Sequence, residues 1–244
     1  MTTRVVPSLL LIGLSLPWLA AHAADDVQTY TATYNAEAKG KEIGDSTFSV
    51  RYIADRMVYE FKSETHAKGM VVKLAVPNPV IQRSEFRVTP TGLEPLEFWY
   101  EDGSRKGEGN VHIVFDWQRK VATTNSKKGR KEFTIQPGAV DAGTLQVALM
   151  RDLATTGKPG HYLLTDEDSM TEYVYQDQGE AQTATGMGKL KTHAFNQQRQ
   201  GSSRINWIWM VPDMKFLPAR IEQRKDSGEV NSAFTLKSAS GIPK

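Results

Sequence analysis

A two-residue alternation of apolar side chains through residues 84–120 constrains the fold more than any other feature of the chain. Apolar residues at every second position share one face of a β-strand, so this stretch predicts three half-buried strands. Residues 89–92 offer proline and glycine, and residues 101–104 offer Asp-Gly, which favour the two turns between the strands. The predicted unit is an antiparallel sheet. Its alternating apolar residues are Phe86, Val88, Leu96, Phe98, Tyr100, Val111, Ile113, Phe115 and Trp117.

Similar alternation predicts strands on both sides of this sheet. Residues 29–38, 48–52 and 57–61 form a predicted meander of three strands. Residues 67–76 are apolar without clean alternation, which indicates a short connecting segment, either one helical turn or a flap. Residues 205–211 are apolar on both faces and predict a strand covered on both sides, near the middle of the sheet or under a helix. Further strands are predicted at residues 121–125, 131–135, 162–164, 172–176, 182–185, 189–195, 216–224 and 230–236.

One segment, residues 141–153, has the helical spacing of apolar residues. Asp141 is placed to cap its N-terminus, and residues 155–159, Thr-Thr-Gly-Lys-Pro, supply a stop signal. No repeat or long linker divides the chain, so residues 24–244 are predicted to form a single β-rich domain. The expected fold class is mainly β: a single strongly curved antiparallel sheet, an incomplete barrel, packed on one α-helix.

Residues 1–23 have the pattern of a secretory signal peptide. Arg4 precedes an apolar run, and Ala21-His22-Ala23 is the small-x-small pattern that precedes a cleavage site. The sequence contains no cysteine, so neither a disulfide nor the lipid attachment of a lipoprotein is expected. The expected location is the periplasm, as an exported, soluble protein that keeps no transmembrane segment after cleavage.

Charge is balanced once the predicted signal peptide is removed, with 29 basic and 28 acidic residues and a net charge of +1 when histidines are neutral. This balance gives no general attraction to nucleic acid, so no nucleic-acid partner is expected. Residues 126–131 form a basic hairpin tip, interpreted as a solvated turn that protects a sheet edge, with contact to an anion or lipid headgroup as the alternative. The acidic residues 166–168 are interpreted as a solvated turn because the spaced ligands of a calcium loop are missing.

Motifs for catalysis, metals or cofactors are missing from the sequence. His66, His112, His161 and His193 have no metal-ligand spacing and are predicted to lie on strand surfaces or in solvent. No nucleophile motif or phosphate loop is present, and residues 186–188 are interpreted as a hairpin turn or bulge. No catalytic residue, metal or cofactor is predicted, and a non-enzymatic protein is expected. Strand-borne carboxylates leave polysaccharide hydrolysis as the least favoured function; they are Glu97, Glu101, Asp116 and Glu172.

Several aromatic and turn residues together resemble a known family of exported bacterial proteins. They are the Tyr-x-Ala-x-Tyr strand at residues 30–34, Ser84-Glu85-Phe86, Pro95 with Phe98 and Tyr100, Phe115-Asp116-Trp117, and the helix start at Asp141. The resemblance is to the envelope family with domain of unknown function 3108 (DUF3108), and it extends over residues 30–236. By analogy of fold, it implies the outline of periplasmic lipid or lipoprotein carriers of the LolA and LolB type. It implies no catalytic residue.

Two functions are compatible with these observations. An incomplete barrel has more inward positions than one helix covers, so its concave side predicts a cavity for a lipid or other apolar ligand. The alternative is an envelope-assembly or structural protein that acts through protein contacts, at a sheet edge or at the basic residues 127–131. For the first function, the predicted ligand-binding residues are Phe98, Phe115, Trp117, Trp207 and Trp209.

Overall fold

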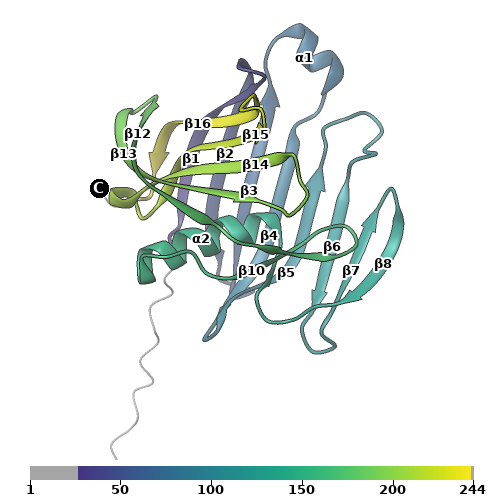
Figure 1. Cartoon of the computed structure of the whole chain (residues 1–244). Helices are drawn as coiled ribbons and strands as arrows, with labels where there is room; N and C mark the ends of the chain where they lie inside the picture. The colour runs from purple at the N-terminus through teal and green to yellow at the C-terminus, as the bar shows by residue number, and fades with distance from the viewer. Residues whose placement is uncertain (1–26, 243–244) are drawn as a thin grey trace, which may run out of the picture.

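The computed structural model describes residues 27–242, so the predicted signal peptide, residues 1–23, lies outside the described residues. Thirteen strands form one strongly curved antiparallel sheet, in which β16 pairs with β1 and the end strands β12 and β8 do not pair with each other (Figure 1). In spatial order the strands are β12 (Gln176–Thr185), β13 (Gly188–Gln198), β14 (Arg204–Val211), β15 (Leu217–Lys225), β16 (Val230–Ser240), β1 (Tyr30–Ala38), β2 (Lys41–Ile53), β3 (Val58–Ala67), β4 (Val80–Thr89), β5 (Gly92–Glu101), β6 (Val111–Asp116), β7 (Val121–Ser126) and β8 (Gly129–Thr134).

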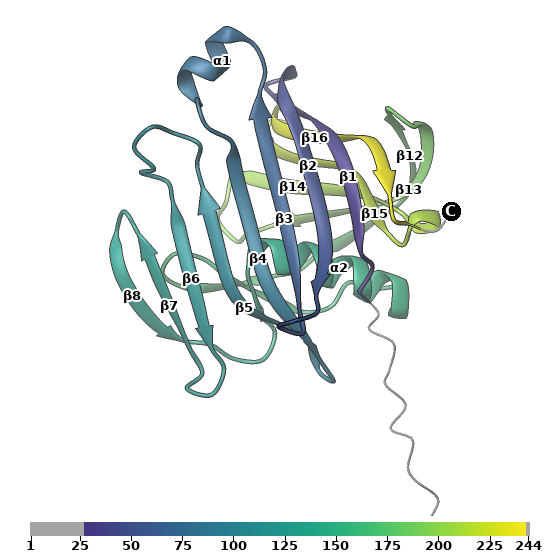
Figure 2. The same ribbon diagram turned by 180° about the vertical axis from the view of Figure 1, so that it is seen from behind.

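The segment between β8 and β12, residues 135–175, is called here the crossing connection because it runs across the concave side of the sheet (Figures 1 and 2). Its helix α2 lies between the half of the sheet formed by β12–β16 and the half formed by β1–β8. The predicted fold class, a mainly β protein with a strongly curved antiparallel sheet packed on one α-helix, is confirmed, and the structure adds the short helix α1. The crossing connection contains β9 (Ala139–Val140), α2 (Ala142–Thr156), β10 (Tyr162–Thr165) and β11 (Met170–Tyr173), and its strands form a second sheet in the order β11-β10-β9.

Alternation buries the concave face of the large sheet. Along β1, Tyr30, Ala32, Tyr34 and Ala36 are buried, while the residues between them are more exposed. The buried side chains form two clusters. The larger joins the first five strands, α2 and the strands β13–β16. The smaller consists of Phe98, Ile113, Phe115, Ala122, Ile135 and Ala139.

Helix α2 begins where the sequence predicts. Asp141 is its N-cap, and one carboxylate oxygen accepts hydrogen bonds of 2.9 Å from the backbone N–H groups of Gly143 and Thr144. Gly143 lies directly on the sheet, because a Cβ at this position would collide with Ser84 and Phe61. Because Gly143 has no side chain, the first turn of α2 can lie in close contact with β3 and β4.

Strand β14 places its two apolar faces in different surroundings. Ile208 and Met210 are buried in the larger cluster. Trp207 and Trp209 alternate with them and lie on the outer face, where their half-buried rings stack at 5.6 Å and the Arg224 guanidinium lies 5.0 Å from the Trp207 ring. The strand is third from one end of the sheet and not near its middle as predicted. Its second apolar face is covered by the stacked tryptophan rings and Arg224, which the alternation alone could not reveal.

The remaining connections are short except for one loop. The predicted Asp-Gly turn is a longer loop, residues 102–110, in which the Asp102 carboxylate accepts hydrogen bonds from the backbone N–H groups of Ser104 (2.9 Å) and Gly109 (2.8 Å). The predicted connecting segment after β3 is a short helix. Its label is α1 (Met70–Ala75), and a single 3-10 turn, η1 (Pro212–Met214), precedes β15.

Candidate functional site

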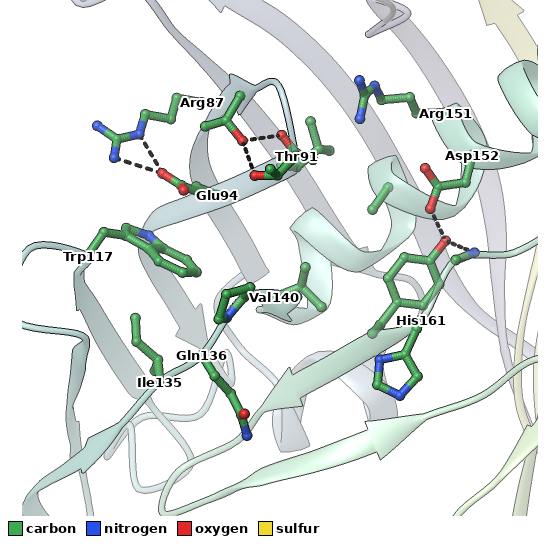
Figure 3. A pocket seen from close by; sticks show the side chains of 18 of the residues that line it. Arg87, Thr91, Glu94, Trp117, Ile135, Gln136, Val140, Arg151, Asp152 and His161 are labelled. Atoms are coloured by element: carbon green, nitrogen blue, oxygen red, sulfur yellow. Dashed lines mark hydrogen bonds and ion pairs between the residues drawn. The ribbon is translucent and has the colours of Figure 1, made fainter.

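A cavity of about 580 Å³ opens between the sheet and the crossing connection. It is surrounded by the β4–β5 hairpin, the turn after β6, the segment leading into β9, and the facing sides of α2 and β10 (Figure 3). Small-molecule sites in proteins commonly measure about 300–1,000 Å³. The cavity is therefore large enough for a small organic ligand.

The floor of the cavity is apolar and continuous with the core. Leu93 of β5, Val140 of β9 and Ala148 of α2 are buried members of the larger cluster, and Ile135 belongs to the smaller one. The cavity thus lies where the two clusters meet. Trp117 adds a half-buried ring, whose Nε1 donates a 2.7 Å hydrogen bond to a backbone carbonyl of β5. Because this bond fixes the ring, the apolar surface is formed before any ligand arrives.

Charged side chains surround the apolar floor. Arg87 and Glu94 form an ion pair of 2.7 Å on the β4–β5 hairpin. Lys120 lies in the turn after β6. Arg151 and Asp152 come from α2 (Figure 3). With histidine neutral, these lining residues carry three positive and two negative charges. The resulting excess of positive charge favours an anionic group at the rim.

The Asp152 carboxylate is hydrogen-bonded to a neighbouring tyrosine. The Tyr162 hydroxyl donates to Oδ2 of Asp152 at 2.7 Å and accepts from the backbone N–H of Gly160 at 2.9 Å. Burial, supported by the adjacent carboxylate, raises the pKa of Tyr162 well above its ordinary value, so the phenol remains protonated at neutral pH. This wall of the cavity is therefore fixed by an internal hydrogen-bond chain.

Arg151 carries a buried donor atom that no acceptor satisfies in the part of the chain that the structure describes. Its Nε is buried and has no hydrogen-bond acceptor among residues 27–242. The side chain lines both this cavity and a second one of about 230 Å³, which α2 forms with Val27, Gln28 and Lys215. A buried donor without an acceptor destabilises the folded chain by about 1–3 kcal/mol, so a ligand carboxylate or phosphate at this position would be favoured.

The structure does not bring the five predicted ligand-binding residues together. Trp117 lines the cavity. Phe98 and Phe115 are buried in the smaller cluster, and Phe98 also lines a separate pocket of about 270 Å³. Trp207 and Trp209 lie on the outer face of the sheet, because the alternate residues of β14 fill the core. The remaining lining residues, Arg151 above all, were missed by the aromatic pattern.

The four histidines among residues 27–242 lie at exposed or half-exposed positions, as predicted from the sequence. Each contacts one carboxylate: His66 with Glu64 at 2.8 Å, His112 with Glu97 at 2.7 Å, His161 with Glu172 at 2.7 Å and His193 with Asp177 at 2.6 Å. Within the described part of the chain, no group of three or more His, Cys, Asp or Glu side chains is arranged to hold a metal ion.

The basic hairpin tip and the acidic run pair with each other. Lys128 lies 2.7 Å from Glu167, and Lys131 lies 3.0 Å from Asp168. Lys127 forms a further ion pair of 2.6 Å with Glu108. The two charged segments were interpreted separately as solvated turns, and the structure adds that much of their charge is compensated within the chain.

These features define a β-rich protein with an open, curved sheet and a cavity beneath a crossing helix. The chain belongs to the family described as "Protein of unknown function (DUF3108)", which matches residues 29–235, so the resemblance seen in the sequence is confirmed. No curated protein matches the chain. Among residues 27–242, no helix has the length and apolar character that a bilayer crossing requires.

Solved structures that match this chain share little sequence with it. A β-barrel-like protein with domain of unknown function DUF1849 from Brucella abortus has a TM-score of 0.49 and 9% identity, covering 89% of this chain and 99% of its own. MucB in the Pseudomonas aeruginosa MucA/MucB complex has a TM-score of 0.35 and 11% identity, covering 88% of this chain and 52% of its own. The chain thus spans about half the length of the MucB structures that it matches.

Proposed function

We propose that this protein is an exported, non-enzymatic binding protein whose cavity holds an amphiphilic anion, with its apolar part on the floor and its acidic group at Arg151. The observation that carries this proposal is the combination of a buried apolar floor with a buried Arg151 Nε that lacks an acceptor. Each ligand methylene removed from water contributes about 0.8 kcal/mol. A charge-assisted hydrogen bond to the guanidinium adds orientation as well as affinity. Fatty acids and lysophospholipids have this combination of groups.

The proposal places the protein in the periplasm, after removal of residues 1–23. Cell fractionation and N-terminal sequencing of the mature protein test this part, and the expected first residue is Ala24. A mature protein that keeps residues 1–23, or one found in the cytoplasm, would contradict it.

The protein-contact alternative receives less support from the basic tip. Lys127, Lys128 and Lys131 already have carboxylate partners within the chain, so a partner would have to compete with these pairs. Polysaccharide hydrolysis also receives little support. Glu97 lies on β5 and Glu172 on β11, and each carboxylate is paired with a histidine and not with the other carboxylate.

The ligand test uses mature protein purified from periplasm without detergent. Native mass spectrometry followed by organic extraction is expected to reveal a bound amphiphile close to one per chain. Ala148→Leu fills the floor and Arg151→Gln removes the charge, and each is expected to reduce binding of a fluorescent fatty acid at least tenfold. Lys158→Gln is the matched control because Lys158 is exposed and lies outside the cavity. A ligand-free mass, together with no fatty-acid binding by the wild type, would refute the proposal.

A further inference from the structure

Helix α1 projects from the end of the sheet remote from the crossing connection (Figures 1 and 2). None of its six residues is buried. Met70, Val71 and Leu74 are 80%, 82% and 67% exposed, which makes them a concentrated apolar group on the surface. Burying such side chains in a soluble core is the usual arrangement, so their exposure indicates an interaction surface.

The segment after α1 is attached to the adjacent loop, residues 102–110. The backbone N–H of Asn78 donates to the carbonyl of Gly103 at 3.1 Å, and its side-chain amide donates to the carbonyl of Ser104 at 3.4 Å. Gly103 permits this close approach, because a Cβ there would collide with Val76 and with the Asn78 carbonyl. The exposed apolar residues therefore have a structured base.

The net charge around α1 is positive. Residues 68–79 and the loop 102–110 contain four basic residues and two acidic ones, Asp102 and Glu108. Lys68 is compensated by Glu42 at 2.6 Å and Asp45 at 2.8 Å. The other three form no ion pair within residues 27–242; they are Lys73, Arg105 and Lys106.

We propose that α1 and the neighbouring loop form a membrane-contact site for bilayers that contain anionic lipids. Met70, Val71 and Leu74 enter the boundary between headgroups and acyl chains, and Lys73, Arg105 and Lys106 contact lipid phosphates. Apolar side chains next to uncompensated basic residues are the combination that favours an anionic membrane interface. Glu108 is paired with Lys127 at 2.6 Å, so the three unpaired basic residues outweigh Asp102 and leave this surface with a net positive charge. This inference does not depend on a ligand in the cavity.

The test uses the absence of native cysteine. Val71→Cys is labelled with the environment-sensitive dye NBD and mixed with vesicles of phosphatidylethanolamine and phosphatidylglycerol. We expect a blue shift and at least a twofold rise in emission. Met57→Cys is the matched control, because Met57 is 75% exposed in the turn at the other end of β3. Its labelled form is expected to show no change with the same vesicles.

Co-sedimentation with vesicles separates the contribution of the apolar residues of α1 from that of the basic residues. Replacing Met70, Val71 and Leu74 together by serine is expected to reduce binding at least tenfold. Lys73→Glu combined with Arg105→Glu and Lys106→Glu is expected to abolish the preference for phosphatidylglycerol over phosphatidylcholine. Far-UV circular dichroism checks that both variants remain folded, and the labelled Val71→Cys protein gives an independent readout. The proposal would be overturned if the label at position 71 showed no emission change with any vesicle, or if the label at position 57 changed equally. It would also be overturned if a cross-linker placed at position 71 captured only proteins in intact cells.

Discussion

The two α-helices of this protein are both rich in apolar residues, but they use them differently. Helix α2 has fifteen residues, eight of which are buried. It begins at a side-chain N-cap, Asp141, and ends at Gly157 in the left-handed conformation (φ 73°). Helix α1 has six residues, none of which is buried, and its N-cap position makes no side-chain hydrogen bond. The contrast indicates that α2 stabilises the fold and forms a wall of the cavity, whereas α1 leaves its apolar side chains available for contact.

The largest effect expected from this contrast follows from truncating the core face of α2. Leu149 is fully buried, so Leu149→Ala is expected to lower the free energy of unfolding by about 2–5 kcal/mol. Urea unfolding followed by circular dichroism measures the change. Leu149→Met keeps most of the volume and is expected to cost less than about 1.5 kcal/mol. Equal losses for the two variants would contradict a packing role.

A second effect concerns the pH dependence contributed by the buried N-cap of α2. Burial raises the pKa of Asp141 to about 6, despite hydrogen bonds from Ser84, Gly143 and Thr144 that lower it. The folded state therefore holds a proton that the unfolded state releases near pH 4. The stabilisation from this proton is present below about pH 4 and is lost as the pH rises through 6, a change of about 3 kcal/mol.

Asp141→Asn isolates this contribution, because asparagine keeps the capping oxygen and does not titrate. We expect the stability of the wild type relative to the variant to fall between pH 4 and pH 6 and to remain constant above pH 7. Urea unfolding of both proteins at several pH values provides the measurement. A pH-independent difference would show that the pKa of Asp141 is the same in the folded and unfolded states.

The close contact between α2 and the sheet leads to a third, smaller effect. Glycine to alanine within a helix ordinarily stabilises a protein by about 1 kcal/mol. At Gly143 the added methyl would collide with Ser84 and Phe61, so Gly143→Ala is expected to lower the free energy of unfolding by about 1–3 kcal/mol instead. Thermal unfolding measures the sign directly. A stabilised variant would mean that the sheet yields to the methyl group.

Local signals in the sequence are sufficient to predict α2 and most strands. Asp141 and the glycine-proline stop mark the helix ends through groups that are close in the chain, and alternation marks each strand in the same way. Pairing of β1 with β16 joins residues about 200 positions apart, and no local pattern specifies that pairing. The face of β14 was also undetermined, because both of its faces are apolar and alternation does not say which one lies inside.

The candidate site was predicted only in part because its residues come from five separate segments. Aromatic content identified Trp117 but also selected Trp207 and Trp209, which lie on the outer face. Arg151 had a signal of its own: it stands three positions after Ala148, a cation on an otherwise apolar helical face. Alone, this pattern does not predict a ligand site, because the sequence does not show that this face of α2 borders a cavity. The cavity exists only because the crossing connection lies across the sheet.

The smallest effect makes the sharpest test of the contrast between the helices. Leu74→Ala is the same substitution as Leu149→Ala, but Leu74 is 67% exposed, so the expected change in the free energy of unfolding is below about 0.5 kcal/mol. Urea unfolding under identical conditions measures both variants. A loss from Leu74→Ala comparable to that from Leu149→Ala would show that α1 packs against the protein in solution. Its apolar side chains would then be unavailable to a membrane, and stability and vesicle binding would be lost together instead of separately.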